Sequence, residues 1–323
     1  MAKKKTKAKA LYDSKAAEAR AEKTTAKVNA YEEKAEERIA KAGTKVLGEL
    51  QQSVARYKKY AKIVLKDVFA GTRKKPELAD VLKVGDDLRN ALLDAGLNDV
   101  ARTLTRELKG MHEAAAEQFK SFDRTPTKSG MDVETLNALV ELKKAEFLDL
   151  ADQRLVTPVR TAIMDGMIGN RDRLDVYDEI SKFIDTQGIT TRGGKEWTDS
   201  QIETLIDDGM RRQLRQAKAQ QAEDFDLKII WYQGPDDKVT SEQCRFMVRY
   251  NKHGAPGMWL VEEFTAPNIN RLMKDKLLKE NPLIVGGHFN CRHTVTYVPY
   301  RFAVEKGWTT PKMKDDLVSE SYG

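Results

Sequence analysis

Two stretches near the carboxyl end decide the fold of the region around them: residues 231–244 read WYQGPDDKVTSEQC, and residues 281–299 read NPLIVGGHFNCRHTVTYVP. Side chains alternate between two faces along residues 227–232 and again along residues 294–299, which is the period of a strand. A Gly-Pro pair and an acidic turn end the first strand. We therefore expect the two strands to pair as an antiparallel ribbon with a helix across it.

Both cysteines of the chain and three of its four histidines lie in this window, as Cys244, Cys291, His253, His288 and His293. If the ribbon forms, Cys244 comes close to the segment that begins at His288. Thiolates and imidazoles are preferred zinc ligands, and the gap between His288 and Cys291 suits a metal knuckle. Cys291 and His293 are two residues apart and face the same way from a strand. The pattern predicts a structural zinc site of Cys244, His288, Cys291 and His293.

Two other interpretations of these residues stay open. The cysteines also suit a role as small buried hydrophobic residues, with the histidines bonded to loop carbonyls, and a disulfide is the third choice. The chain has no CxxC pair, which is the spacing that makes a zinc assignment specific. Two cysteines in 323 residues do not suggest a disulfide scaffold. The Gly286-Gly287 pair indicates a sharp turn or a close backbone approach, for packing or for a site.

Upstream of this window the sequence is dominated by helical patterns. Residues 1–45 are rich in Ala, Lys and Glu, and they predict a basic arm, partly disordered, with a marginal helix that orders on a partner and breaks at Gly43. Apolar residues at three- and four-residue steps predict a helical domain over residues 46–165, interrupted at Pro158.

The remaining ranges are a helical connector over residues 166–225, a C-terminal module over residues 226–305, and a polar, peripheral tail over residues 306–323. The expected fold class is α+β, mainly α, with long N-terminal helices and a small C-terminal α+β module that contains the antiparallel ribbon.

The net charge of +6 is spread over mixed signs and makes only a mild case for a polyanionic partner. Five lysines crowd the first ten residues with no acidic residue among them, and these are Lys3, Lys4, Lys5, Lys7 and Lys9. Such an arm binds DNA phosphates through counterion release, or it is a solvated tail without contacts. The basic end of the helix predicted from residue 202 to about 222 is expected to be a solvated face, with a phosphate-facing or partner-facing role as the alternative.

The sequence lacks the apolar core of a signal peptide and any membrane-spanning stretch, so we expect a soluble protein made in a cytoplasm. It contains no Walker loop, dinucleotide fingerprint or GxSxG elbow. A nuclease of the HNH type would need a catalytic base that HFNCRH does not supply convincingly. A thiol nucleophile at Cys291 would need activation by a neighbour such as His293. A catalytic set is therefore not expected.

The C-terminal window resembles the head morphogenesis, or minor head protein, family of tailed bacteriophages, which includes protein F of phage Mu. In that family an aspartate-rich turn precedes a cysteine, and a proline-containing segment leads into His-x-Asn-Cys-Arg. The matching positions in this sequence are Asp236, Asp237, Cys244, Pro282, His288, Asn290, Cys291 and Arg292. This sequence has SEQC where many members have a paired-cysteine turn.

The resemblance covers about the last third of the chain. It implies a structural protein of the virion, present in several copies, that binds portal and capsid proteins during head assembly and DNA packaging. The resemblance also implies a role in DNA ejection, since some members enter the host with the genome. The alternative is a nucleic-acid-processing enzyme or toxin-like domain that uses the Cys/His cluster.

Overall fold

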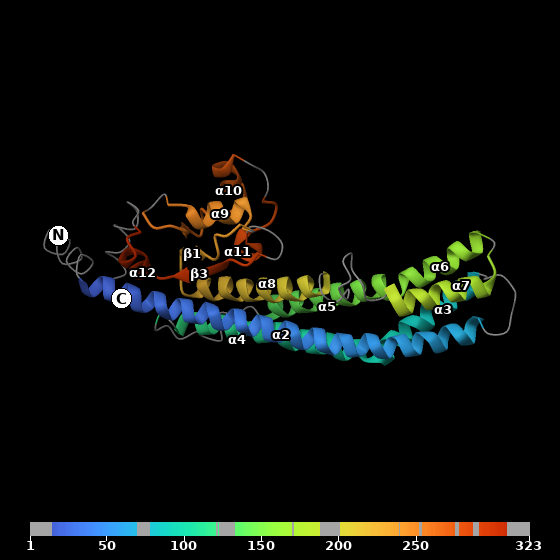
Figure 1. Ribbon diagram of the computed structural model, residues 1–323. Coiled ribbons are helices and arrows are strands. Elements are labelled where there is room, and N and C mark those ends of the chain that lie inside the picture. The colour runs from blue at the N-terminus through green and yellow to red at the C-terminus, as the bar shows by residue number, and fades with distance from the viewer. Residues whose placement is uncertain are drawn as a thin grey trace. The chain divides into compact units, whose positions relative to one another are not determined.

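A computed structural model describes residues 15–69, 78–120, 122, 133–169, 171–187, 201–238, 240–251, 254–274, 278–286 and 291–308. Over these residues the protein is mainly helical with one small antiparallel sheet, so the expected fold class is confirmed. The helices in Figure 1 are α2 (Lys15–Phe69), α3 (Leu78–Leu92), α4 (Asn98–Lys120), α5 (Val133–Leu155), α6 (Thr157–Ile168), α7 (Arg173–Lys182), α8 (Gln201–Asp224), α9 (Glu242–Arg249), α10 (Ala266–Met273), α11 (Pro282–Val285) and α12 (Tyr300–Glu305). Two π-helical turns, η1 (Leu93–Leu97) and η3 (Phe183–Gln187), and three strands, β1 (Ile229–Gln233), β2 (Met258–Leu260) and β3 (Thr294–Val298), complete the elements.

The chain forms two compact units, and each is discontinuous in sequence, unlike the consecutive ranges expected from the sequence. Unit 1 comprises residues 1–39, 109–137 and 210–323. Unit 2 comprises residues 40–108 and 138–209. Helices α2, α4, α5 and α8 each contribute residues to both units.

Helix α2 corrects the expectation of a separate N-terminal arm. The helix runs unbroken from Lys15 to Phe69, so the break expected at Gly43 is wrong. A glycine inside a helix costs about 1 kcal/mol relative to alanine, which the burial of a few apolar side chains outweighs. In unit 1 the sparse apolar residues of α2 are buried, with Val28 0% and Ile39 1% exposed. Residues 15–39 of the expected arm therefore belong to unit 1, where their apolar side chains are part of the core.

Unit 2 is built from helices whose apolar faces follow the expected periodicity. Residues 133–155 read as one amphipathic helix in the sequence, and α5 has these bounds, although Leu142, expected on its inward face, is 53% exposed. Residues 78–93 read as another helical run, and α3 ends at Leu92, where η1 begins. Gly96 lies inside η1 with a φ of 97°, a left-handed conformation that favours glycine, and it produces the kink before α4. Pro158 stands in the first turn of α6, so it begins a helix at the point where the sequence pattern indicated an interruption.

The sheet of unit 1 has the strand order β2-β1-β3, and both pairings are antiparallel. In the β1–β3 pairing, Tyr232 lies opposite Val295 and Gln233 lies opposite Thr294, which confirms the ribbon expected from the sequence. Strand β2 was not predicted, because a strand of three residues is too short to show an alternating pattern.

The two faces of the sheet pack into different clusters. Ile230 and Tyr232 of β1 lie in a cluster with residues of α9 and α10, which are drawn above the strands in Figure 1. Ile229 of β1 packs on the other face with residues of α12 and with Trp308. Trp308 is 0% exposed, so the tail expected to be polar and peripheral from Lys306 onward contains a core residue.

Candidate metal centre

Cys244 is placed by the start of a short helix. Ser241 is the N-cap of α9, and its side chain accepts a hydrogen bond from the Cys244 backbone N–H at 3.3 Å. Glu242 adds an acidic side chain to the first turn, where its negative charge interacts favourably with the positive end of the helix dipole. The Cys244 side chain is consequently directed into the core of unit 1, where it is 0% exposed.

Cys291 and His293 stand at the entrance to β3, and two glycines make room for them. At Gly286, whose φ is 71°, an added Cβ would lie 2.6 Å from the Cys291 Sγ. At Gly234, an added Cβ would lie 2.5 Å from the His293 Cδ2. Both contacts are closer than real Cβ atoms allow, so any larger residue at Gly286 or Gly234 would displace a side chain of the site.

Arg215 of α8 holds the segment that carries these residues. Its guanidinium donates hydrogen bonds to the carbonyl oxygens of Ile284, Cys291 and His293, at 3.2, 2.8 and 2.6 Å. Arg215 is only 4% exposed. A buried guanidinium with several acceptors fixes the backbone of the segment and places a positive charge near the Cys291 sulfur.

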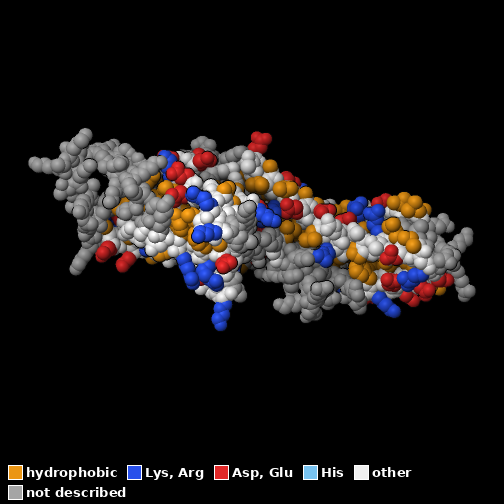
Figure 2. All heavy atoms as spheres, turned by 90° about the horizontal axis from the view of Figure 1, so that it is seen from above, with side chains coloured by type: hydrophobic (Ala, Val, Ile, Leu, Met, Phe, Trp, Pro, Cys, Tyr) orange, Lys and Arg blue, Asp and Glu red, His pale blue; other side chains and the backbone are white. Residues whose placement is uncertain are grey.

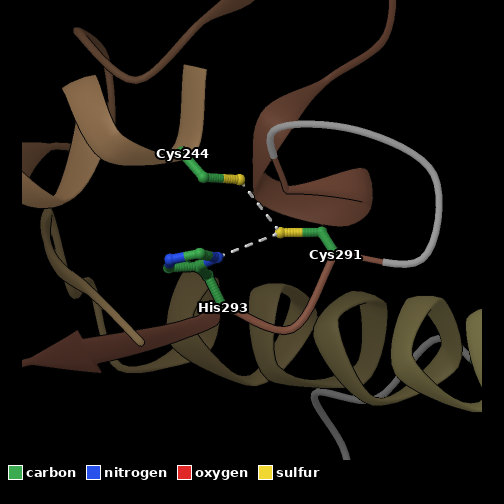
Figure 3. Close-up of side chains that lie close together, drawn as sticks. All are labelled: Cys244, Cys291 and His293. Carbon is green, nitrogen blue, oxygen red and sulfur yellow. Dashed lines mark hydrogen bonds between the residues drawn. The ribbon is translucent and has the colours of Figure 1, made fainter. Parts of the chain in front are cut away.

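The three side chains converge as Figure 3 shows: Cys244 comes from α9, and Cys291 and His293 come from the approach to β3. The two sulfurs lie 3.4 Å apart and do not form a disulfide. The Cys291 Sγ lies 3.6 Å from the His293 Nδ1, and one donor atom from each of the three residues falls within 4.8 Å of the others. This buried group can hold a metal ion.

The hydrogen bond of His293 decides which ring nitrogen is available. Its Nε2 lies 2.8 Å from the Pro235 carbonyl oxygen, which can only accept a hydrogen bond. In the neutral ring Nε2 therefore carries the proton, and Nδ1 presents its lone pair toward Cys291. Burial of the cysteines and a carbonyl bond to the histidine are also features of the non-metal interpretation. The direction of Nδ1 is what favours a ligand, since metal-binding histidines are commonly oriented by a carbonyl in this way.

The two cysteines differ in acidity. The pKa of Cys291 is lowered because the Cys244 thiol donates a hydrogen bond to its sulfur, and Arg215 and Tyr232 lower it further, while burial opposes the shift. The pKa of Cys244 is raised by the same hydrogen bond and by burial. Of the two cysteines, Cys291 therefore loses its proton more readily, and a metal ion would have to displace the proton of Cys244.

Tyr232 lies against the same group. Its hydroxyl is 3.3 Å from the Cys244 Sγ and 3.3 Å from the Cys291 Sγ. Its ring stacks on the His293 imidazole, with a centroid distance of 5.3 Å and an interplanar angle of 5°. Burial raises the pKa of Tyr232, and the two cysteines raise it further.

The acidic turn supports the site from outside. Asp236 pairs with Arg245 at 3.1 Å and Arg249 at 2.6 Å, and Asp237 pairs with Arg292 at 2.9 Å. The Thr240 hydroxyl donates to the Pro235 carbonyl oxygen at 2.8 Å. Both aspartates thus form ion pairs with arginines. Together with the Thr240 bond, these pairs fix the turn that contains Pro235, whose carbonyl oxygen orients His293.

The structure brings together three of the four predicted zinc ligands, Cys244, Cys291 and His293. His288 lies outside the described residues, and so does His253. The predicted DNA-binding residues Lys3, Lys4, Lys5, Lys7 and Lys9 also lie outside them. On the face in Figure 2, the described Lys and Arg side chains stand among Asp and Glu side chains.

Sequence reasoning missed Tyr232 and Arg215. The strand alternation already placed Tyr232 on one face, but nothing in the pattern indicated that this face carries the cysteines. The solvated face expected for the end of α8 is wrong at Arg215 and Lys218, which are 4% and 1% exposed. A run of basic residues does not by itself reveal which of them meet buried acceptors.

A scan against protein-family models, a search of curated proteins and a search of solved structures each gave no match. Among the described helices, none is both long enough and apolar enough to cross a membrane.

Proposed function

We propose that this protein is a minor head protein of a tailed bacteriophage, which binds portal and capsid proteins while the head is assembled and filled with double-stranded DNA. The observation that carries the proposal is the meeting, in one buried group, of the two stretches that resemble the head morphogenesis family. Cys244 and Cys291 are 0% exposed and His293 is 2% exposed, so a polymeric substrate has no direct access to them. The burial of all three side chains supports a structural role for this group.

The same resemblance supports further parts of the proposal. The protein is a virion component present in several copies per particle, and it accompanies the DNA during packaging and ejection. Its basic N-terminal residues, Lys3 to Lys9, contact DNA phosphates by counterion release.

We also propose that the buried group holds a structural zinc ion. Two thiolates and an imidazole are preferred zinc ligands, and the Nδ1 orientation of His293 supports this choice. The spacing HFNC favours His288 as the fourth ligand. A zinc ion would supply a cross-link between α9 and the start of β3 and would stabilise the fold around it.

Co-purification tests the proposed partners. The chain is expressed together with the portal and capsid proteins of the same phage, and we expect it to co-elute with the portal. A variant with Gln at the five N-terminal lysines serves as a matched control, since it should lose salt-dependent DNA binding and keep the portal complex. Failure of the unmodified chain to bind either protein would contradict the proposal.

Elemental analysis tests the zinc. We expect about one zinc ion per purified chain and a loss of the metal in Cys291→Ser and His293→Ala. His112→Gln is the control, because His112 is a described histidine that is bonded to Gln213 and lies outside this group. Equal zinc content in all four proteins would show that any bound zinc is held elsewhere, and no zinc in the wild type would end this part of the proposal.

An assay with DNA and RNA, with and without divalent metal ions, separates the structural role from the enzymatic alternative. We expect no cleavage by the wild-type protein. Cleavage that disappears in His288→Ala or Cys291→Ser would instead favour a nucleic-acid-processing enzyme or toxin-like domain.

A further inference from the structure

Tyr232 contacts all three residues of the candidate metal centre: its hydroxyl lies against both sulfurs, and its ring stacks on the His293 imidazole. The hydroxyl oxygen and the two sulfurs form a nearly equilateral triangle, with sides of 3.3, 3.3 and 3.4 Å. Tyr232 is 0% exposed, so water does not compete for this hydroxyl.

The chemistry of the group assigns the direction of the hydrogen bond. A phenol is neutral at neutral pH and carries one O–H donor, whereas a thiolate is an acceptor. A phenolate would place a further negative charge beside the buried sulfurs, which is costly without further cations. The hydroxyl therefore acts as a donor to the sulfurs, shared between them or given to one at a time.

We propose that Tyr232 is a positioning residue of the metal centre, whose hydroxyl donates a hydrogen bond to the thiolates of Cys244 and Cys291 and whose ring holds the His293 imidazole in plane. This inference rests on the proposed metal site. It adds a residue that controls how strongly the sulfurs and the imidazole hold the ion.

Two consequences follow from the loss of this hydroxyl. The thiolates would be left with less compensation for their buried charge, and groups that orient metal ligands are typically worth about 10- to 100-fold in metal affinity. The sulfurs would also become more electron-rich. With Co²⁺ as a spectroscopic probe, the charge-transfer band from sulfur to cobalt would then move to lower energy.

The test compares wild type, Tyr232→Phe and Tyr297→Phe in anaerobic Co²⁺ titrations against a competing chelator. Tyr297 is the matched control because it is a buried tyrosine of the adjacent strand, in the same cluster, with no sulfur contact among the described interactions. We expect wild type and Tyr297→Phe to share one affinity and one band position. Tyr232→Phe should bind about 10- to 100-fold more weakly, with its band shifted to lower energy.

The band position separates positioning from general destabilisation, because it reports only molecules that are folded and loaded. Weaker binding with an unmoved band would overturn the inference, and so would an unchanged affinity.

If Tyr232→Phe does not fold, a fluorotyrosine introduced only at position 232 keeps the shape and makes the hydroxyl a stronger donor. We then expect a shift to higher energy, and an unmoved band would again overturn the inference. No Co²⁺ binding by the wild type would refute the metal site itself, whereas normal wild-type binding with an unaffected Tyr232→Phe would refute only the role of Tyr232.

Discussion

The two compact units are stabilised by different kinds of interior. Among the described residues, the buried charged side chains are Glu32, Arg215 and Lys218 in unit 1 and Asp208 in unit 2. The ion pairs of unit 2 lie nearer the solvent, as in Arg89–Asp152, where the side chains are 50% and 25% exposed. Unit 2 therefore depends mainly on apolar periodicity, while unit 1 depends on particular polar partners that are far apart in sequence.

The buried pair Lys218–Glu32 provides the largest test of this difference. The Lys218 Nζ lies 3.0 and 3.1 Å from the two carboxylate oxygens of Glu32 and 4.8 Å from the centre of the Tyr31 ring. Thr296 of β3 donates to the same carboxylate. Burial lowers the pKa of Lys218, and Glu32 opposes this effect. The ion pair thus compensates two charges that have little access to water.

We expect Lys218→Met to lower the free energy of unfolding of unit 1 by about 3–5 kcal/mol, because it leaves Glu32 as an uncompensated buried charge. Urea unfolding followed by tryptophan fluorescence measures the loss, since three of the four tryptophans of the chain, Trp231, Trp259 and Trp308, lie in unit 1. The double variant Lys218→Met/Glu32→Leu removes both charges and should recover most of it. A loss of less than about 1 kcal/mol in the single variant would mean that the pair behaves like an exposed one.

Truncation of a buried apolar side chain in unit 2 tests whether that unit depends on its apolar interior. Leu65 of α2 is 0% exposed and Ile63 is 58% exposed. We expect Leu65→Ala to lower the free energy of unfolding by about 2–5 kcal/mol through lost burial and the cavity that it leaves. Ile63→Ala, the matched control, should change it by no more than about 0.5 kcal/mol. Thermal and urea unfolding followed by helical circular dichroism compare the two, and similar losses would contradict the buried stripe.

The same contrast explains how much of the structure could be predicted from the sequence. Helix α5 and the end of α3 follow from apolar spacing, and the β1–β3 ribbon follows from alternation. The break predicted at Gly43 is wrong, because local helix propensity does not register the burial of Val28 and Ile39 on the same helix. The helix therefore continues where a break was expected.

The sequence was sufficient to predict the candidate ligand residues of the site, but not the residues that hold them in place. Cys244, Cys291 and His293 stood out as residue types, and one ribbon was enough to bring them together. Arg215 looked like any other residue in a basic run, although its three carbonyl acceptors lie 69 to 78 positions along the chain. Contacts over such separations leave no periodic signal in the sequence.

The exposed ion pair Arg89–Asp152 of unit 2 is the counterpart of the buried pair Lys218–Glu32 of unit 1, and we expect its loss to change stability less. Arg89 makes two hydrogen bonds to the Asp152 carboxylate, at 2.9 and 3.2 Å. Because solvent screens both groups, we expect Arg89→Met to lower the free energy of unfolding of unit 2 by no more than about 1 kcal/mol. The difference from wild type should shrink further at high salt. A loss as large as that of Lys218→Met, measured by the same urea titration, would show that exposure does not distinguish the two units.

The last prediction concerns a histidine of unit 1, whose effect on stability arises only at mildly acidic pH. The Gln213 Nε2 lies 2.7 Å from the His112 Nε2 and also donates to the Leu136 carbonyl oxygen at 3.1 Å, so the ring nitrogen must accept. Burial lowers the pKa of His112 and nearby Lys109 lowers it further, while Glu113 opposes them. The unfolded chain therefore takes up a proton more readily than the folded one.

Stability must consequently fall as the pH drops from the ordinary histidine pKa of 6.5 through the lowered value of the folded protein. Protonated His112 would turn a donor toward the Gln213 amide, which costs about one hydrogen bond, or roughly 0.5–1.5 kcal/mol. His112→Gln does not titrate, so its unfolding free energy should lose less between neutral and mildly acidic pH than that of wild type. Identical slopes for the two proteins would mean that His112 takes up its proton equally readily in the folded and unfolded chains, so its contact with Gln213 would not be one of the polar partnerships on which unit 1 depends.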